Sequence, residues 1–360
     1  MYIKSLKLEN FRNYNNISVN FHPGVNILIG DNAQGKTNLI EAIYMMSFAK
    51  SFRTRKDRDI IMFDRNYAKV EAVIEGDDGE QPFSMLIKPD NKYISYDGVK
   101  ISKMTDLLEK VYVVIFSPED LKLVKDSPDR RRKFIDRELS KLRPSYYENL
   151  YKYKKVLKQR NAYLKEESIQ TDILKIWDYK LSEYGTEIIR KRKDFVEKIE
   201  KVSSDIHRSI TSGKETLTVK YEPNIIYSEN MMSDFIETTE KNLEKDLSQR
   251  TTSRGPHKDD IKICINGVDV RNFGSQGQQR TAALSLKLAE IKLIKEITGE
   301  DAVLLLDDVL SELDKTRQTY LINCLNDVQI FITTTEISDD VAESFPKGIT
   351  YHIKNGEIDG

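Results

Sequence analysis

The amino-acid sequence predicts an α/β fold whose two halves are separated by a long, mostly helical insertion. A short apolar strand, Val25–Ile29, runs directly into a glycine-rich loop and then into a helix over Lys36–Phe48. Between Arg130 and about Ile210 there is one glycine and one proline, and the apolar residues follow a helical period. Strand and turn signals return after Arg254-Gly255-Pro256. We therefore expect one discontinuous α/β domain interrupted by a helical arm.

The flanking thirds of the chain carry the strands and helices of this α/β domain. Before the insertion, period-two or apolar segments predict the strands Tyr2–Leu8, Ala68–Glu75, Phe83–Lys88, Tyr93–Tyr96 and Val111–Phe116, with a turn over Asn13–Asn16. After it, they predict the strands Ile261–Ile265, Ala302–Leu306 and Gln329–Thr333, a helix from about Gly277 to Ile297 and a helix near Lys315–Asn326. These elements place the domain boundaries at 1–118 and 255–360 for the α/β domain and 119–254 for the arm.

The insertion predicts two helices that fold back on each other. An apolar stripe stepping by three, four or seven residues extends from Ile173 to Ile206, and Pro144–Lys165 carries a similar stripe. A polar break at Glu166–Thr171 allows the two helices to pair antiparallel. Packing between the helices, rather than a partner site, is the expected use of the stripes.

The composition predicts a soluble protein whose cysteines are reduced. The sequence has 360 residues, 39% hydrophobic and 32% charged. Apolar stretches such as Val111–Phe116 are far shorter than the roughly 20 residues that span a bilayer, and Met1–Leu6 lacks the apolar run of a secretory signal. Cys264 and Cys324 are expected to be reduced, buried thiols rather than part of a disulfide framework or metal site. We therefore expect a cytoplasmic protein without membrane association.

The positive charge is concentrated in the middle of the chain. Arg130–Lys193 contains 19 Lys and Arg against 9 Asp and Glu, a local charge of +10 in a chain with a net charge of −1. Basic runs stand at Lys50–Arg58, Arg130–Lys133 and Arg190–Lys193. Each run alone is typical of a solvated face, but together they favour contact with a phosphate backbone. No base-reading motif accompanies them, so sequence-independent DNA binding is expected.

A phosphate-binding loop follows the first buried strand. Residues 30–37 fit the pattern G-x-x-x-x-G-K-[ST], and the residues expected to bind a nucleotide there are Gly30, Asp31, Asn32, Ala33, Gln34, Gly35, Lys36 and Thr37. The glycines let the backbone curl so that successive N–H groups face a phosphate. Lys36 would reach the β- and γ-phosphates, and the Thr37 hydroxyl would bind Mg²⁺.

A second constellation ends a later apolar strand. Val303–Leu306 is followed by Asp307 and Asp308. A buried parallel strand delivers such an acid at its carboxyl end, where Asp307 could bind Mg²⁺. Asp308 could orient or deprotonate the attacking water, which makes Lys36, Asp307 and Asp308 the candidate catalytic residues.

A third constellation precedes the long C-terminal helix. In Gly274–Arg280, a hydroxyl residue, a glycine and amides at a helix start form a surface rich in donors for phosphate oxygens. Ser275, Gly277 and Gln278 are the candidate residues. Taken alone, the same pattern also describes a polar helix cap.

Together these motifs resemble the ABC-type ATPases, and within them the SMC branch, in which an arm separates two halves of an ATPase head. The resemblance narrows to the RecF family of bacterial recombination mediators. The residues that carry it are Leu8–Tyr14, the loop from Gly30 to Asn38, Ser117–Leu121, Gly255–Asp260, Ser275–Arg280, Asp307-Asp308 and Ser311–Asp314. The resemblance adds Arg12 and Asn38 to the nucleotide-binding residues.

The resemblance implies an ATP-dependent homodimer that binds ATP and Mg²⁺ and hydrolyses ATP slowly, as a weak DNA-dependent ATPase. Ser275, Gly277 and Gln278 would act on the nucleotide held by the other subunit, and Asp314 would lie at the same interface. It further implies DNA as ligand, a RecR-like mediator as partner, and indirect help in placing RecA on single-stranded gaps.

The sequence also departs from this pattern and leaves alternatives open. ABC proteins usually carry glutamate where Asp308 stands, and many relatives carry a histidine after the strand Ile330–Thr335 and a glutamine after Val111–Phe116. His257 could lie near the nucleotide or be a turn histidine with a structural partner. A nucleotide-binding subunit of an ABC transporter and an SMC-like chromosome organiser remain alternative functions. The former would carry a shorter insertion, and the latter arms of hundreds of residues.

Overall fold

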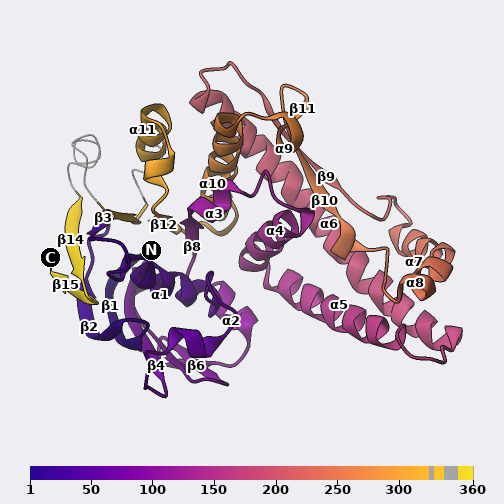
Figure 1. Cartoon of the computed structure of the whole chain (residues 1–360), viewed down its shortest axis with the longest axis horizontal. Helices are drawn as coiled ribbons and strands as arrows, with labels where there is room; N and C mark the ends of the chain where they lie inside the picture. The colour runs from indigo at the N-terminus through magenta and orange to yellow at the C-terminus, as the bar shows by residue number, and fades with distance from the viewer. Residues whose placement is uncertain (324–327, 336–347, 360) are drawn as a thin grey trace. The chain divides into compact units, whose positions relative to one another are not determined.

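The computed structural model describes residues 1–323, 328–335 and 348–359. The chain forms two compact units, one of residues 1–121 and 290–360, the other of residues 122–289 (Figure 1). The second boundary therefore differs from the predicted 254/255, because residues 255–289 belong to the second unit. Strand β10 (Asp260–Ile265) pairs along its whole length with β9 (Leu217–Glu222), which follows the arm helices in sequence.

The first unit contains a mostly parallel sheet with the strand order β15-β14-β3-β13-β12-β8. Its strands are β3 (Val25–Ile29), β8 (Val113–Phe116), β12 (Val303–Asp307), β13 (Ile330–Thr334), β14 (Ile349–Lys354) and β15 (Glu357–Asp359). The strands from β14 to β8 run parallel, so their carboxyl ends meet at one edge. Strand β13 lies between β3 and β12, a neighbour relation that determines the geometry of the site.

An antiparallel sheet with the order β2-β1-β4-β5-β6-β7 forms the other layer of this unit. Its strands are β1 (Tyr2–Phe11), β2 (Tyr14–Asn20), β4 (Ala68–Gly76), β5 (Gly79–Ile87), β6 (Lys92–Tyr96) and β7 (Val99–Ile101). The turn predicted over Asn13–Asn16 is shorter, because Tyr14 already pairs with Phe11. The burial of Tyr14 in the core extends strand pairing to the edge of this turn.

Helix α1 (Lys36–Phe48) is the centre of the core. Its residues Leu39 to Ser47 are buried without interruption, and they pack with side chains from both sheets. A helix that is apolar all round must be covered on all sides, which explains its place between two sheets. The remaining elements are η1 (Asp57–Ile60), α2 (Met104–Leu108), α3 (Pro118–Leu121), η3 (Leu310–Glu312) and α11 (Lys315–Asn323). The predicted end of the last helix, and Cys324, lie outside the described residues.

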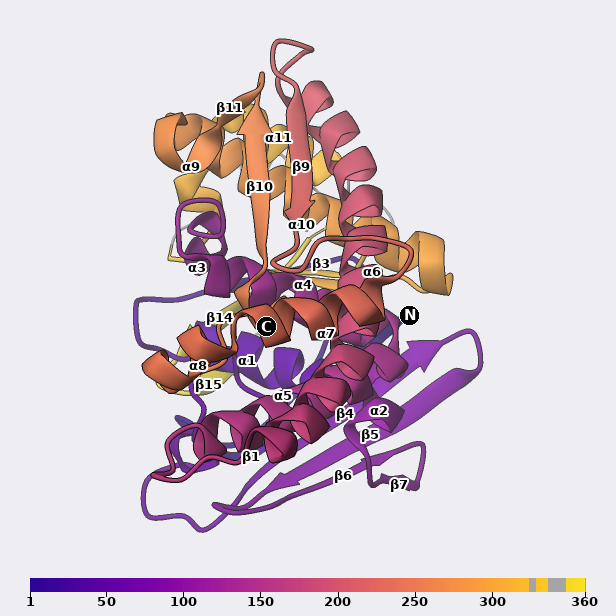
Figure 2. The same ribbon diagram turned by 90° about the vertical axis from the view of Figure 1, so that its right-hand side faces the viewer.

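The second unit is built on the predicted antiparallel helix pair. Helix α5 (Pro144–Tyr163) packs along α6 (Thr171–Ile210), and both views show the two side by side (Figures 1 and 2). With 40 residues, α6 is about 60 Å long. The unit also contains α4 (Pro128–Leu142), α7 (Met231–Lys241), α8 (Leu243–Gln249), η2 (Pro256–Lys258), β11 (Val268–Asp269) and α9 (Val270–Phe273), and α10 (Gln276–Thr298) begins in it.

The segment Gly255–Asp260 anchors the helices of this unit. Arg192 of α6 donates to the carbonyl of Pro256 at 2.6 Å and to Asp259 Oδ2 at 2.9 Å. His257 accepts from the Tyr153 hydroxyl, with 2.7 Å between Oη and Nδ1, and its Nε2 lies 2.9 Å from the carbonyl oxygen of Thr252. Of the two interpretations of His257, the structure therefore supports the turn histidine with structural partners.

None of the described helices combines the length and apolarity needed to cross a membrane. Cys264 is a buried free thiol.

Candidate nucleotide and nucleic-acid sites

The glycine-rich loop joins β3 to α1, and two of its glycines are required by close contacts. A Cβ on Gly30 would lie 2.2 Å from the carbonyl oxygen of Ile353, a separation that no side chain tolerates. Gly35 has a φ of 129°, and a Cβ there would meet the Tyr14 hydroxyl at 2.8 Å. The loop therefore keeps its tight curl only with glycine at both positions.

Residues remote in sequence hold the outside of this loop. The Asn13 side-chain amide donates to the carbonyl of Gln34 at 2.8 Å, and the N–H of Gly356 donates to the same carbonyl at 3.1 Å. The N–H of Asn355 donates to Gln34 Oε1 at 2.6 Å. The β14–β15 turn thus clamps the loop, a support that sequence reasoning missed because Asn355 and Gln34 are 321 residues apart.

Lys36 points back along its own loop. The side chain is 4% exposed, and its ammonium donates to the carbonyls of Gly30 at 2.5 Å and Asp31 at 3.0 Å. These bonds place a nearly buried positive charge inside the curl of the backbone. A phosphate entering the loop would therefore meet this charge at short range.

Thr37 and Asp307, predicted to share a metal ion, are brought together by the fold. The Thr37 hydroxyl donates to Asp307 Oδ1 at 3.0 Å, although 270 residues separate them. The hydroxyl of Thr333, on the intervening strand β13, donates to the same oxygen at 2.9 Å. Burial raises the pKa of the Asp307 carboxyl above its ordinary value, while the two hydroxyl hydrogen bonds oppose that shift. Sequence reasoning missed Thr333, whose place becomes evident only from the strand order.

Asp308 has a left-handed backbone, with a φ of 53°. Its N–H donates to the Thr333 hydroxyl at 2.9 Å. A left-handed aspartate at the end of a strand turns the chain sharply away from the sheet. Asp308 therefore stands where the chain leaves the sheet, and it is half-buried.

Arg12 and Asn38 stand beside the loop in a connected polar network. The Arg12 guanidinium forms a bidentate pair with the fully buried Glu41 of α1, at 2.8 and 2.7 Å. Asn38 donates to Asn13 Oδ1 at 2.7 Å and accepts from Arg53 at 2.6 Å. Among the described residues, the bonds of Arg12 use three of its five guanidinium N–H groups, two toward Glu41 and one toward the carbonyl of Asp59, so two remain for a phosphate.

The third constellation starts α10 in the second unit. Ser275 and Gln276 are exposed, and Gly277 and Gln278 are half-buried. The Gln279 side chain donates to the carbonyl of Gly274 at 3.1 Å and fixes the preceding turn. An exposed hydroxyl at the amino end of a 23-residue helix is accessible to a ligand from outside the chain.

In the first unit, Asp314 caps α11 by accepting from the N–H of Arg317 at 3.0 Å.

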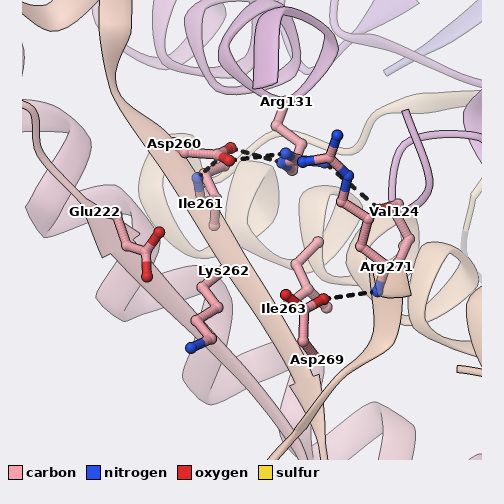
Figure 3. A pocket seen from close by; sticks show the side chains of 9 residues that line it. All are labelled: Val124, Arg131, Glu222, Asp260, Ile261, Lys262, Ile263, Asp269 and Arg271. Atoms are coloured by element: carbon pink, nitrogen blue, oxygen red, sulfur yellow. Dashed lines mark hydrogen bonds and ion pairs between the residues drawn. The ribbon is translucent and has the colours of Figure 1, made fainter. Parts of the chain in front are cut away.

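The runs Arg130–Lys133 and Arg190–Lys193 mix buried, paired arginines with exposed residues such as Lys133 and Lys191. Arg131 is 2% exposed and forms a bidentate pair with Asp260, at 2.7 and 2.8 Å (Figure 3). Arg132 donates to the carbonyl of Asp259 at 2.7 Å, and Arg192 is buried between Asp136 and Asp259. The expectation that Arg131 contacts DNA is therefore wrong, because its guanidinium is buried and paired inside the protein.

Further exposed cations lie on α5. Lys154, Lys155 and Lys158 are all exposed. In the part of the chain that the structure describes, no ion pair engages Lys155 or Lys158. In the first unit, Arg55 and Lys56 of the run Lys50–Arg58 are also exposed. These side chains, rather than the buried Arg131, are the candidates for contact with a polyanion.

A P-loop between a parallel strand and a buried helix, with an acid at the end of the second strand along, defines the class of protein. The chain is a P-loop ATPase head of the ABC/SMC type with an inserted helical arm. The family model for the RecF/RecN/SMC N terminal domain matches residues 2–345. A DNA replication and repair protein RecF of Clostridium perfringens (strain SM101 / Type A) is 46% identical over 359 residues, covering 99% of both chains. The RecF of Clostridium botulinum (strain Alaska E43 / Type E3) is 45% identical over the same length and coverage. The chain belongs to the RecF family.

Solved structures agree with this assignment. The structure of the recombination mediator protein RecF-ATPrS in the RecFOR pathway has a TM-score of 0.92 at 39% identity, covering 99% of this chain and 97% of that one. A Smc head domain from Pyrococcus furiosus, bound to a domain of ScpA, has a TM-score of 0.58 at 17% identity, covering 99% and 95%. The second likeness concerns the fold alone.

Proposed function

We propose that this chain is an ATP-dependent DNA-binding protein of recombinational repair, whose ATP-bound form is a dimer and whose slow hydrolysis resets it. The observation that carries the proposal is the meeting of Thr37 and Asp307 at 3.0 Å beside the curled loop that holds Lys36. The likeness to RecF structures with ATP and ATPrS supports the choice of nucleotide.

The residues at this point fit a magnesium ion. A threonine hydroxyl and a carboxylate are oxygen donors, which Mg²⁺ prefers, and Mg²⁺ is usually held by one or two protein groups together with phosphates and water. Among the described residues there is no cluster of three or more His, Cys, Asp or Glu, so the protein alone offers no full cage. Thr37 and Asp307 would hold the ion, which when bound would neutralise charge on the phosphates.

The protein's own groups then have separate tasks. The backbone N–H groups of Gly30–Thr37 and the Lys36 ammonium would bind the phosphates. Thr333 orients the Asp307 carboxylate, and Asp308 would accept a proton from, or orient, the attacking water. A shorter acid than glutamate at this position fits a slow reaction, in which ATP occupancy lasts long enough to hold a complex.

DNA binding is assigned to the exposed cations of α5 and of the run Lys50–Arg58. Ser275, Gly277 and Gln278 would contact the nucleotide of a second subunit, so that ATP joins two copies of the arm. Joining two arms would double the phosphate contacts and make DNA retention depend on ATP. By resemblance, a RecR-like mediator would be the partner through which RecA reaches single-stranded gaps, in the cytoplasm.

The nucleotide part of the proposal is tested by calorimetry with Mg-ATP on the parent chain and on Lys36→Ala. Loss of ATP binding with an unchanged melting temperature is the expected result, because the ammonium lies inside the loop. Lys50→Ala, outside the loop on the same unit, is the control. Parent-like ATP affinity in Lys36→Ala would refute the assignment of the site.

A further inference from the structure

The first turn of α10 is closed by two reciprocal hydrogen bonds. The N–H of Ser275 donates to Gln278 Oε1 at 3.0 Å, and the N–H of Gln278 donates to the Ser275 hydroxyl oxygen at 3.2 Å. This arrangement is a capping box, in which each side chain satisfies an N–H of the other residue. The position of the exposed Ser275 hydroxyl therefore depends on the orientation of the Gln278 amide.

Glu215 determines that orientation. Gln278 Nε2 donates to Glu215 Oε1 at 2.9 Å. An ionised carboxylate can only accept, so it faces the NH₂ end of the amide and leaves the amide oxygen for the N–H of Ser275. Without this carboxylate, the amide could turn over. Its NH₂ group would then face the N–H of Ser275, and because both are donors the capping box would open.

Glu215 is itself held from the other side. It lies in the turn between α6 and β9, and its Oε2 is 3.2 Å from Nε2 of His207 in the last turn of α6. His207 is fully buried, and its Nδ1 is 3.2 Å from the Ser285 hydroxyl of α10. Ser285 in turn donates to the carbonyl of Thr281 at 2.8 Å. Hydrogen-bonding contacts thus link the end of α6 to α10 at two points, through Glu215 to Gln278 and through His207 to Ser285.

We propose that Glu215 is a positioning residue for the Ser275–Gln278 turn, and that through His207 it ties this turn to the end of the arm helix α6. The inference rests on the proposed function, in which this turn completes the ATP site of a second subunit. Glu215 touches no reacting atom. Its effect is to keep the Ser275 hydroxyl and the first turn of α10 in one arrangement before the subunits meet, which reduces the ordering cost of association.

The test compares Glu215→Ala, Gln278→Ala and the double variant by light scattering over a concentration series with Mg-ATP. Each single variant should weaken dimerisation about tenfold, the size of a missing hydrogen bond to a charged group. The double variant should be no weaker than either single one, because both changes open the same capping box. Glu215→Gln, which keeps an acceptor oxygen, should recover most of the parent's dimerisation.

Glu200→Ala is the matched control. Glu200, on α6, is a carboxylate that accepts the backbone N–H of Val219 at 3.1 Å, but unlike Glu215 it makes no bond to α10 among the described residues. It should dimerise like the parent chain, and Mg-ATP affinity of the monomer should be the same in all variants. Parent-like dimerisation of Glu215→Ala, or effects of the two single variants that multiply in the double one, would overturn the proposal.

Hydrogen exchange of the nucleotide-free chain separates this proposal from the proposed function. In Glu215→Ala, the amides of residues 275–279 should exchange about tenfold faster, while those of β9 and β10 stay as in the parent. Faster exchange together with a parent chain that never dimerises would support the positioning role and refute the ATP-gated dimer. Unchanged exchange would refute the positioning role itself.

Discussion

The hydroxyl of Thr333 donates to the Oδ1 atom of Asp307 at 2.9 Å and accepts the N–H of Asp308 at 2.9 Å. One side chain therefore fixes both acids at the end of β12. It can do so because β13 lies between β12 and the strand that carries the P-loop. In metal sites, loss of a partner that orients a ligand in this way typically lowers metal affinity or activity by about 10- to 100-fold.

Thr333→Val should raise the Mg²⁺ concentration needed for half-maximal tightening of ATP binding by about tenfold, because it leaves the Asp307 carboxylate without its orienting donor. Thr333→Ser keeps the hydroxyl and should behave like the parent. Calorimetry of ATP binding at a series of Mg²⁺ concentrations measures the difference. An unchanged Mg²⁺ dependence in Thr333→Val would show that the Thr37 hydroxyl alone orients Asp307.

Asp308→Asn should bind Mg-ATP within about twofold of the parent but hydrolyse it about 100-fold more slowly, the decrease expected when a general base is removed. Its ATP-bound dimer should accordingly persist longer. Single-turnover hydrolysis, followed together with light scattering, measures both quantities. Asp308→Glu, which introduces the longer acid of the ABC-type pattern, is the comparison and should hydrolyse at least as fast as the parent. Parent-like hydrolysis by Asp308→Asn would assign the water to another residue.

The double variant Lys155→Ala/Lys158→Ala should weaken duplex DNA binding. It should also reduce the slope of log affinity against log salt by about 0.9 for each phosphate that the variant no longer neutralises. Lys245→Ala, an exposed lysine of α8 outside the basic segment, should bind like the parent. A salt titration with ATP measures the slope. Parent-like slope and affinity in the double variant would exclude this face of α5 from the DNA site.

Arg131→Ala should instead destabilise the second unit by about 3 kcal/mol, because it leaves Asp260 without its bidentate partner. Any decrease in DNA binding should follow the decrease in folded protein. Thermal unfolding followed by the fluorescence of Trp177, the one tryptophan of the chain, reports on this unit. An Arg131→Ala chain with parent stability and a reduced salt slope would reinstate Arg131 as a DNA contact.

His257 predicts a pH dependence of stability. Burial lowers its pKa to about 4, so the folded chain holds it neutral while the unfolded chain binds a proton near pH 6.5. The stabilisation is therefore present above about pH 6.5 and is lost as the pH falls toward 4. The slope of the unfolding free energy with pH measures how many more protons the unfolded chain binds than the folded chain. In His257→Gln, that number should be smaller by up to one in this range. Equal slopes in denaturant titrations at about pH 6.5, 5.5 and 4.5 would contradict the burial of a neutral His257.

The sequence predicted the elements whose signals are local. Strand β3, helix α1 and the α5–α6 pair follow from apolar period and from a motif contained in eight residues, and the structure has them at the predicted places. The sequence predicts a domain boundary at residue 255 because Gly255-Pro256 is a strong turn signal. The pairing of β9 with β10 across that junction is non-local and invisible to period and composition.

The contacts that position the site were not predictable for the same reason. Thr333, Asn355 and Glu215 act on residues 26, 321 and 63 positions away, and each is a common residue type with no motif of its own. The prediction that Arg131 contacts DNA was wrong because a run of charged residues predicts exposure only on average. Arg131 and Arg192 find carboxylates on other elements, which the sequence does not reveal.

The central claim, that ATP joins two copies of this chain through the Ser275 turn, is tested most directly by light scattering with Mg-ATP on the parent chain and on Ser275→Arg. The parent should reach about twice the 41.8 kDa chain mass with Mg-ATP and return to the monomer mass without it. Ser275→Arg should bind ATP nearly as the parent does but remain a monomer, because the larger side chain blocks the partner's phosphates. Normal ATP-induced dimers of Ser275→Arg, or a parent mass that ignores ATP, would contradict the account.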